Sequence, residues 1–360
     1  MTRLKSSGLA AQPSLWWLAA GFALLLGARA QAQETSLSGF SAPKDELAEE
    51  KLTGWAKRFE GSSLIFEQST TPDTLFPGSQ LSPIPSYQWW LSLRPRFYFI
   101  PDTLSLRVRI DETLEWLNAV DTTLLREPTF GDTWVDLAYN PPEVWGILST
   151  FSLRSIWGTS IAAISAGDVV DIGPRVSLVR DFRLKRGGEV ELSVASYGLY
   201  HFVTSNTGGT QTSYGCTSTD FDPIDCSQNT GQANPQVSLV TAGNIRYNPI
   251  RRLSIDVSYS LLNTWAYGIT GGTIATQTGA PLELTASPTD TRLRDFGWFL
   301  ASVDYEVRRW FSVGVGYYCL RPTLDPDSQY GNPFYSPGNT RIFLTTTFNL
   351  DWAYQYLARR

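Results

Sequence analysis

The stretch Arg251–Tyr267, RRLSIDVSYSLLNTWAY, presents two different faces when every second residue is compared. One face is apolar and is interrupted only by Asn263; its members are Leu253, Ile255, Val257, Tyr259, Leu261, Trp265 and Tyr267. The opposite face is polar and carries Ser254, Asp256, Ser258, Ser260 and Thr264. A period of two predicts a β-strand with one apolar and one polar face. At roughly fifteen residues it is much longer than the five or six residues of an ordinary strand.

The N-terminus has the pattern of a secretory signal peptide. It combines a basic start at Arg3 and Lys5, an apolar run over 15–26, and A-x-A motifs that end at Ala30 and Ala32. The apolar run is shorter than the roughly 20 residues that span a membrane as a helix. We therefore predict an exported chain that is cleaved after Ala32, with an uncleaved N-terminal anchor as the alternative.

The composition of the remaining chain points to a membrane protein without transmembrane helices. Cleavage after Ala32 removes three of the 29 basic residues, Arg3, Lys5 and Arg29, and leaves 26 basic against 34 acidic residues. The resulting net charge of −8 disfavours nucleic acid as a partner. Aromatic residues make up 13% of the chain, and charged residues make up 18%, against roughly 25% in soluble proteins. No later segment approaches 18 consecutive apolar residues. This combination is typical of outer-membrane β-barrels, whose strands alternate between lipid and lumen.

Strand patterns like that of 251–267 recur along most of the chain. We expect twelve strands, with a local bulge at Pro95. They lie at about 61–69, 87–100, 104–110, 134–139, 147–158, 171–184, 189–203, 236–247, 251–267, 295–307, 311–320 and 341–354. Connections near 101, 141, 186, 249 and 309 are short, and those near 78, 121, 164, 220, 280 and 331 are long. Outer-membrane barrels have an even strand number, short periplasmic turns and long extracellular loops.

The predicted fold class is all-β, a closed antiparallel up-and-down transmembrane barrel with both termini in the periplasm. Closure is required because an open edge in hydrocarbon leaves backbone groups unpaired. Over residues 60–356 the chain resembles Gram-negative outer-membrane β-barrel proteins as a class, although no motif points to one family. The resemblance implies an outer-membrane location. Residues 33–59 are expected to form a periplasmic segment, partly helical or disordered, and 357–360 a tail that departs from the usual aromatic C-terminus.

Alternation predicts which charged side chains face the lumen. The basic ones are Arg94, Arg96, Arg107, Arg109, Arg154, Arg175 and Arg246, and the acidic ones are Glu191, Asp256, Asp304, Glu306 and Asp351. Arginines fall mainly on strands two to seven and most acids on strands eight to twelve, which predicts a pore with a basic wall. The alternative is that the charges pair across a filled lumen, since twelve strands lie between filled barrels of about eight and open ones of sixteen or more. Inward aromatic residues narrow any pore; they are Trp90, Tyr98, Trp134, Tyr197 and Trp298.

The sequence gives little indication of catalysis. His201 is the sole histidine, and Val203 rather than a serine lies two residues further on. Outer-membrane phospholipase A, which this chain resembles only in its twelve strands, has a Ser there. Within the local sequence, only Ser205 is a candidate partner for His201, so we predict no enzyme, no catalytic residues, no metal and no cofactor. A lipid hydrolase is retained as an alternative.

The predicted function is a porin-like passive channel for small polar, and in particular anionic, solutes. Its expected partners are outer-membrane lipid and these solutes. The other alternative is a plugged structural or surface-binding barrel whose long loops recognise a partner, with loop 204–235 as the candidate. In an oxidising compartment, Cys216 and Cys226 in that loop are predicted to form a disulfide, and Cys319 is predicted to be an unpaired apolar residue within a strand.

Overall fold

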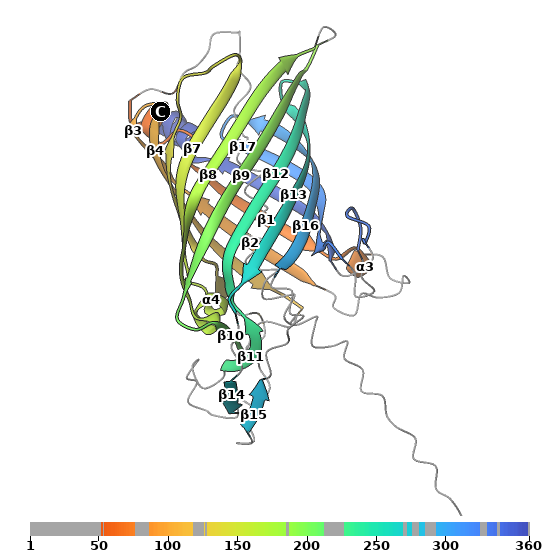
Figure 1. Cartoon of the computed structure of the whole chain (residues 1–360). Coiled ribbons are helices and arrows are strands. Elements are labelled where there is room, and N and C mark those ends of the chain that lie inside the picture. Colours follow the sequence, from red (N-terminus) through yellow and green to blue (C-terminus); the bar gives the residue numbers. More distant parts are fainter. Residues whose placement is uncertain are drawn as a thin grey trace, which may run out of the picture.

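One antiparallel sheet of twelve strands closes on itself as an up-and-down barrel (Figure 1). The computed structural model describes residues 52, 54–75, 86–117, 126, 128–184, 187–211, 227–268, 272–275, 281–284, 293–324, 330–336 and 339–358. The first and last strands pair from Ser63 with Asn349 to Thr70 with Ile342, which removes the free edge. The predicted fold class is confirmed.

The barrel strands match the predicted ranges closely in most cases. They are β1 (Ser63–Thr70), β2 (Tyr87–Arg94) continued by β3 (Arg96–Ile100), β4 (Leu104–Glu115), β6 (Thr133–Tyr139), β7 (Ile147–Trp157), β8 (Asp168–Arg183), β9 (Glu189–Val203), β12 (Pro235–Ile250), β13 (Leu253–Ala266), β16 (Leu293–Arg308), β17 (Phe311–Pro322) and β18 (Thr340–Asn349). Pro95 interrupts the second strand because proline has no N–H to donate. Its carbonyl still accepts from the Val108 N–H at 2.9 Å, and β2 and β3 both pair with β4.

The exposure of β13 shows which face of each strand is apolar. Outward Ile255, Val257 and Leu261 are 37%, 41% and 40% exposed. Inward Asp256 and Ser258 on the same strand are each 2% exposed. This arrangement, with polar side chains inside and apolar side chains outside, is the reverse of that in a soluble protein. It suits a barrel whose outer wall contacts lipid. The stretch 251–267 therefore has its apolar face on the outside.

Short and long connections gather at opposite ends of the barrel. The short ones are 101–103, 140–146, 184–188, 251–252 and 309–310. The long ones contain elements that were expected only as loops: α3 (Pro72–Leu75), β5 (Pro128–Phe130), α4 (Ile161–Ala166), and the hairpins β10 (Thr207–Gln211) with β11 (Ser227–Ala233) and β14 (Gly272–Ala275) with β15 (Pro281–Leu284). Helix α4 begins where the Ser160 hydroxyl accepts from the Ala163 N–H, and it ends at Gly167, whose φ is 80°. Both hairpins and α4 lie at the end opposite the C-terminus (Figure 1).

The end of the chain differs from the prediction. The last strand stops at Asn349 and α5 (Leu350–Ala358) follows, whereas a strand to residue 354 and a barrel to 356 were expected. Buried Asp351 accepts from the Gly61 N–H at 2.8 Å, and the Leu350 N–H donates to the Ser62 carbonyl. These bonds turn the chain toward α2 (Gly54–Arg58), which contacts α5. Burial raises the pKa of Asp351 above its usual range.

Two apolar residues on the outer side of the barrel are covered by the chain. Phe299 and Cys319 lie on the outward side of β16 and β17, yet both are buried. Part of this cover comes from the segment 330–336, where the Phe334 ring meets the Phe299 ring edge-to-face at 4.9 Å. Cys319 is a free thiol, as predicted. The predicted Cys216–Cys226 disulfide, the signal peptide and the N-terminal part of 33–59 lie outside the described residues.

Candidate functional site

The structure places the predicted lumen residues on the inward face. Seven of them are buried: Arg109, Arg154, Arg175, Arg246, Glu191, Asp256 and Asp304. Four are partly exposed: Arg94, Arg96, Arg107 and Glu306. Asp351 does not line the barrel wall as expected, because it lies in α5 rather than in a strand.

Two of the buried arginines lie between aromatic rings. We call Trp90, Arg109, Trp134, Arg154 and Tyr197 the arginine–aromatic stack. The Arg109 guanidinium carbon lies 5.5 Å from the centre of the Trp90 ring and 4.9 Å from that of Trp134. The Arg154 carbon lies 4.8 Å from Trp134 and 4.7 Å from Tyr197. A cation over an aromatic face is attracted by the ring quadrupole, most strongly where water is excluded.

Carboxylates from the same part of the barrel neutralise these arginines. Arg154 donates to Asp136 through Nε and Nη2, both at 2.8 Å, in the bidentate geometry that a guanidinium and a carboxylate prefer. Arg175 Nη1 lies 3.9 Å from the same carboxylate. Arg109 pairs with Asp111, whose Oδ2 lies 2.6 Å from Nη2.

The predicted separation of basic and acidic halves is therefore wrong in part. Asp111, Asp136 and Asp171 face inward on β4, β6 and β8, among the arginines. The physical reason is that a buried charge is costly unless an opposite charge and hydrogen bonds compensate for it. Alternation could have located Asp136, because it lies two residues after inward Trp134. On the other side of the lumen, Arg246 also has a partner, Asp256, at 2.7 Å.

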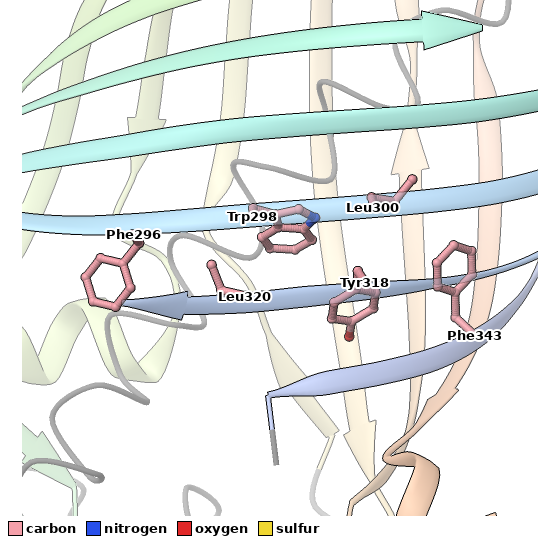
Figure 2. Packing of buried hydrophobic residues seen from close by; sticks show 6 residues of the cluster. All are labelled: Phe296, Trp298, Leu300, Tyr318, Leu320 and Phe343. Atoms are coloured by element: carbon pink, nitrogen blue, oxygen red, sulfur yellow. The ribbon is translucent and has the colours of Figure 1, made fainter. Parts of the chain in front are cut away.

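A second part of the lumen wall is apolar. We call Phe296, Trp298, Leu300, Tyr318, Leu320 and Phe343 the apolar cluster; all six come from β16, β17 and β18 and are buried (Figure 2). The Trp298 and Tyr318 rings stack with their centres 5.2 Å apart. Of these residues only Trp298 was predicted as an inward aromatic. Leu262 on β13 packs against this cluster and also against a second buried cluster, which is made of Trp134, Ile156, Tyr197, Leu199 and Val240.

A third arrangement surrounds His201, the sole histidine. Its Nε2 lies 2.7 Å from the Ser238 hydroxyl, and its Nδ1 lies 2.8 Å from Asp171 Oδ1. The Ser238 and Thr264 hydroxyls are 3.2 Å apart. Ser205, the partner considered from the local sequence, contacts Thr207 instead. Ser238 is distant in sequence, so only the pairing of β9 with β12 could have identified it.

No protein-family model matches the chain, and no curated protein matches it significantly. Among solved structures it is similar to the NanC porin, with 8% identity and a TM-score of 0.40 over 80% of this chain and 98% of that one. For the KdgM porin the identity is 9% and the TM-score is 0.37, and the match covers 79% of this chain and 98% of that one. An outer-membrane channel from Pseudomonas putida F1 has 12% identity and a TM-score of 0.42, and the match covers 80% of this chain and 93% of that one.

Among the described residues, no group of three His, Cys, Asp or Glu side chains is placed to hold a metal ion. The fold itself is defined by a closed even-stranded sheet, an apolar outer wall, a polar inner wall, and short turns opposite long connections. The chain has the architecture of an outer-membrane β-barrel protein.

Proposed function

We propose that this barrel is a passive channel for small polar solutes, with a preference for anions, in the outer membrane of a Gram-negative bacterium. The outer wall supports contact with lipid, because most of its exposed residues on the long strands are apolar. The inner wall carries hydrogen-bonding and charged groups that a solute could use in place of water.

The observation that carries the anion preference is the concentration of arginines on β2, β3, β4, β7 and β8. Asp111 and Asp136 pair with Arg109 and Arg154, and Arg94 and Arg96 donate to the hydroxyls of Ser92 and Ser105. This arc of the wall therefore gathers six inward guanidinium groups, those of Arg94, Arg96, Arg107, Arg109, Arg154 and Arg175. Rings of basic side chains favour anions in pores because they attract the permeating ion and repel cations.

The test is the conductance of the refolded full-length protein in a planar bilayer. We expect step conductance, with a reversal potential in a salt gradient that indicates anion preference. Arg107→Gln should reduce this preference, because Arg107 is partly exposed on the inward face. Arg252→Gln is the matched control, since it removes the same charge from an exposed turn outside the lumen. Cation preference in the unaltered protein would contradict the proposed selectivity.

A filled barrel held together by its internal charge pairs is the second candidate. The burial of the inward side chains favours it, and Arg154 is the clearest example at 0% exposure. Twelve strands do not decide between the two, because filled barrels have about eight and open ones sixteen or more. Absence of step conductance at every voltage, in protein that has folded, would favour the filled barrel over the channel.

A further inference from the structure

We propose that Ser238, His201 and Asp171 form a nucleophilic triad that cleaves neutral carboxylic esters inside the barrel. This inference goes beyond the proposed channel and does not depend on it. It also departs from the expectation, drawn from the sequence, that the chain is not an enzyme. It rests on the positions of three side chains that three neighbouring strands bring together.

The three strands place the triad near the end of the barrel that carries the long connections. Strand β9 pairs with β8 on one side and with β12 on the other. Asp171 lies directly opposite His201 in the β8–β9 register. Ser238 lies opposite Leu199, one diagonal step from His201 on the same inward face. Cross-strand neighbours of this kind are within side-chain reach, so the register allows the contact.

The distances fit the roles of a nucleophile, a base and a group that orients the base. A Ser–His pair requires about 2.6–3.2 Å between its heavy atoms, and Ser238 Oγ lies 2.7 Å from His201 Nε2. A proton on Nδ1, the nitrogen that faces Asp171, leaves Nε2 free to accept the serine proton. The Asp171 oxygen lies 2.8 Å from Nδ1 but to one side of the N–H direction. Catalytic contacts often align only when substrate binds.

The surroundings hold this arrangement and exclude water. Ser238 and His201 are both buried. The Tyr267 hydroxyl donates to the His201 carbonyl at 2.7 Å, which fixes the backbone that carries the base. The Thr264 hydroxyl, 3.2 Å from Ser238 Oγ, is the nearest side-chain donor for an oxyanion that forms beside the serine. Water exclusion strengthens each of these interactions.

The neighbouring side chains indicate the substrate class. Leu199, Val240 and Leu262 lie two residues from His201, Ser238 and Thr264 on the strands that carry those residues, and they belong to or pack against a buried apolar cluster beside the triad. An apolar acyl group is the kind of group that such surroundings favour. Asp168 and Asp132 lie close enough to Asp171 to interact with it electrostatically, and this negative charge disfavours anionic substrates. A neutral ester with a short aliphatic acyl chain meets both conditions.

The reaction requires only water as a second substrate. Ser238 Oγ forms a bond to the carbonyl carbon while its proton passes to His201 Nε2. The bond to the alkoxy oxygen then breaks, and the alcohol leaves with that proton. Water next gives a proton to Nε2 and its oxygen bonds to the acyl carbon. The Ser238–acyl bond breaks, the serine recovers the proton, and the carboxylic acid is released.

The first experiment is labelling of the refolded full-length protein with a fluorophosphonate probe, followed by peptide mass spectrometry. We expect one modified residue, Ser238, together with hydrolysis of p-nitrophenyl butyrate. Ser238→Ala should abolish both, and His201→Gln should slow both by about 10²-fold or more. Ser258→Ala is the matched control, because Ser258 is another buried inward serine on a neighbouring strand and should leave both unchanged. Heat-modifiable gel mobility reports whether each variant has folded.

Asp171 is a positioning residue in this scheme, and a pH profile tests that role. The charged or titratable groups that face His201 are Asp171 and Asp168 on β8, with Asp132 and Tyr267 beyond them. In Asp171→Asn the imidazolium loses its carboxylate, so we expect a lower maximum rate and an acidic limb moved to lower pH. A purely structural role for Asp171 would leave the midpoint of that limb unchanged.

The inference is overturned if folded wild-type protein shows no Ser238 labelling and no ester hydrolysis between about pH 6 and 9, the ordinary assay range for a histidine base. It is equally overturned if labelling persists in Ser238→Ala. Either result would leave His201, Ser238 and Asp171 as a structural hydrogen-bonded group. Neither result bears on conductance, which depends on the pore and not on the serine.

Discussion

The arginine–aromatic stack and the apolar cluster occupy the same kind of position but are stabilised in different ways. Both are inward, buried and built around a tryptophan, Trp134 in the stack and Trp298 in the cluster. Two guanidinium groups flank Trp134, whereas the ring of Tyr318 stacks on Trp298. Alternation in the sequence determines that both face inward, but the neighbours across the strands determine what each one does.

The difference has an energetic consequence. A buried ion pair is costly to break, because removal of one partner leaves the other charged and desolvated. An apolar contact leaves no such charge behind. Its loss costs the free energy of burying the removed atoms and of the cavity that remains. The stability losses caused by substitutions in the stack should therefore depend strongly on one another. Those caused by substitutions in the cluster should scale with the side-chain volume removed.

The largest expected effect is that of Arg154→Ala. It leaves Asp136 buried without its bidentate partner, and we expect the free energy of unfolding in lipid vesicles to fall by about 3–5 kcal/mol. Urea titration followed by tryptophan fluorescence measures this. Arg252→Ala, an exposed arginine in the turn after β12, is the control and should change little. A loss below about 1 kcal/mol would show that the pair does not stabilise the stack.

The second prediction concerns the coupling within that pair. If both charges are replaced, as in Asp136→Leu with Arg154→Met, neither member of the bidentate pair is left buried without the other. We expect the double variant to recover about 2–3 kcal/mol relative to the sum of the single ones, which a double-mutant cycle measures. Additive losses would mean that Asp136 and Arg154 act independently, contrary to their bidentate contact.

The third prediction tests the apolar cluster. Leu300→Val removes one methylene from a buried position and should cost about 1 kcal/mol. Leu261→Val makes the same change on the outer wall, where lipid can fill the space, and should cost less. Equal losses at the two positions would contradict the assignment of Leu300 to a packed interior and Leu261 to the lipid face.

The smallest effect is expected outside both regions. Lys57 Nζ and Asp102 Oδ2 are 3.0 Å apart, with the two side chains 42% and 67% exposed. Lys57→Ala should cost less than about 1 kcal/mol. The bond and charge of Asp102 raise the pKa of Lys57 above its ordinary value of 10.5. Its contribution is therefore present at neutral pH and lost as pH rises through the raised pKa. A loss as large as that of Arg154→Ala would remove the contrast between exposed and buried pairs.

The sequence was sufficient for features that depend on period and turn chemistry. The range predicted for 189–203 is the range of β9, and the alternation in 251–267 correctly places its two faces. It was insufficient at residues 350–358, LDWAYQYLA, where alternate apolar residues suggested a strand but the bonds of Asp351 and Leu350 start a helix. It also missed Asp136 as a counter-charge and Ser238 as the partner of His201. Both contacts are set by the register between strands, which periodicity within a single strand does not contain.

The most direct test of the whole account is the accessibility of β13, residue by residue, in lipid vesicles. Single nitroxide labels would be placed at successive positions from 254 to 261, in a chain whose cysteines at 216, 226 and 319 are replaced by alanine. We expect collision with oxygen to alternate with a period of two, with maxima at Ile255, Val257, Tyr259 and Leu261 and minima at the positions between them. A profile without this period, or with its maxima at Ser254, Asp256, Ser258 and Ser260, would contradict the barrel.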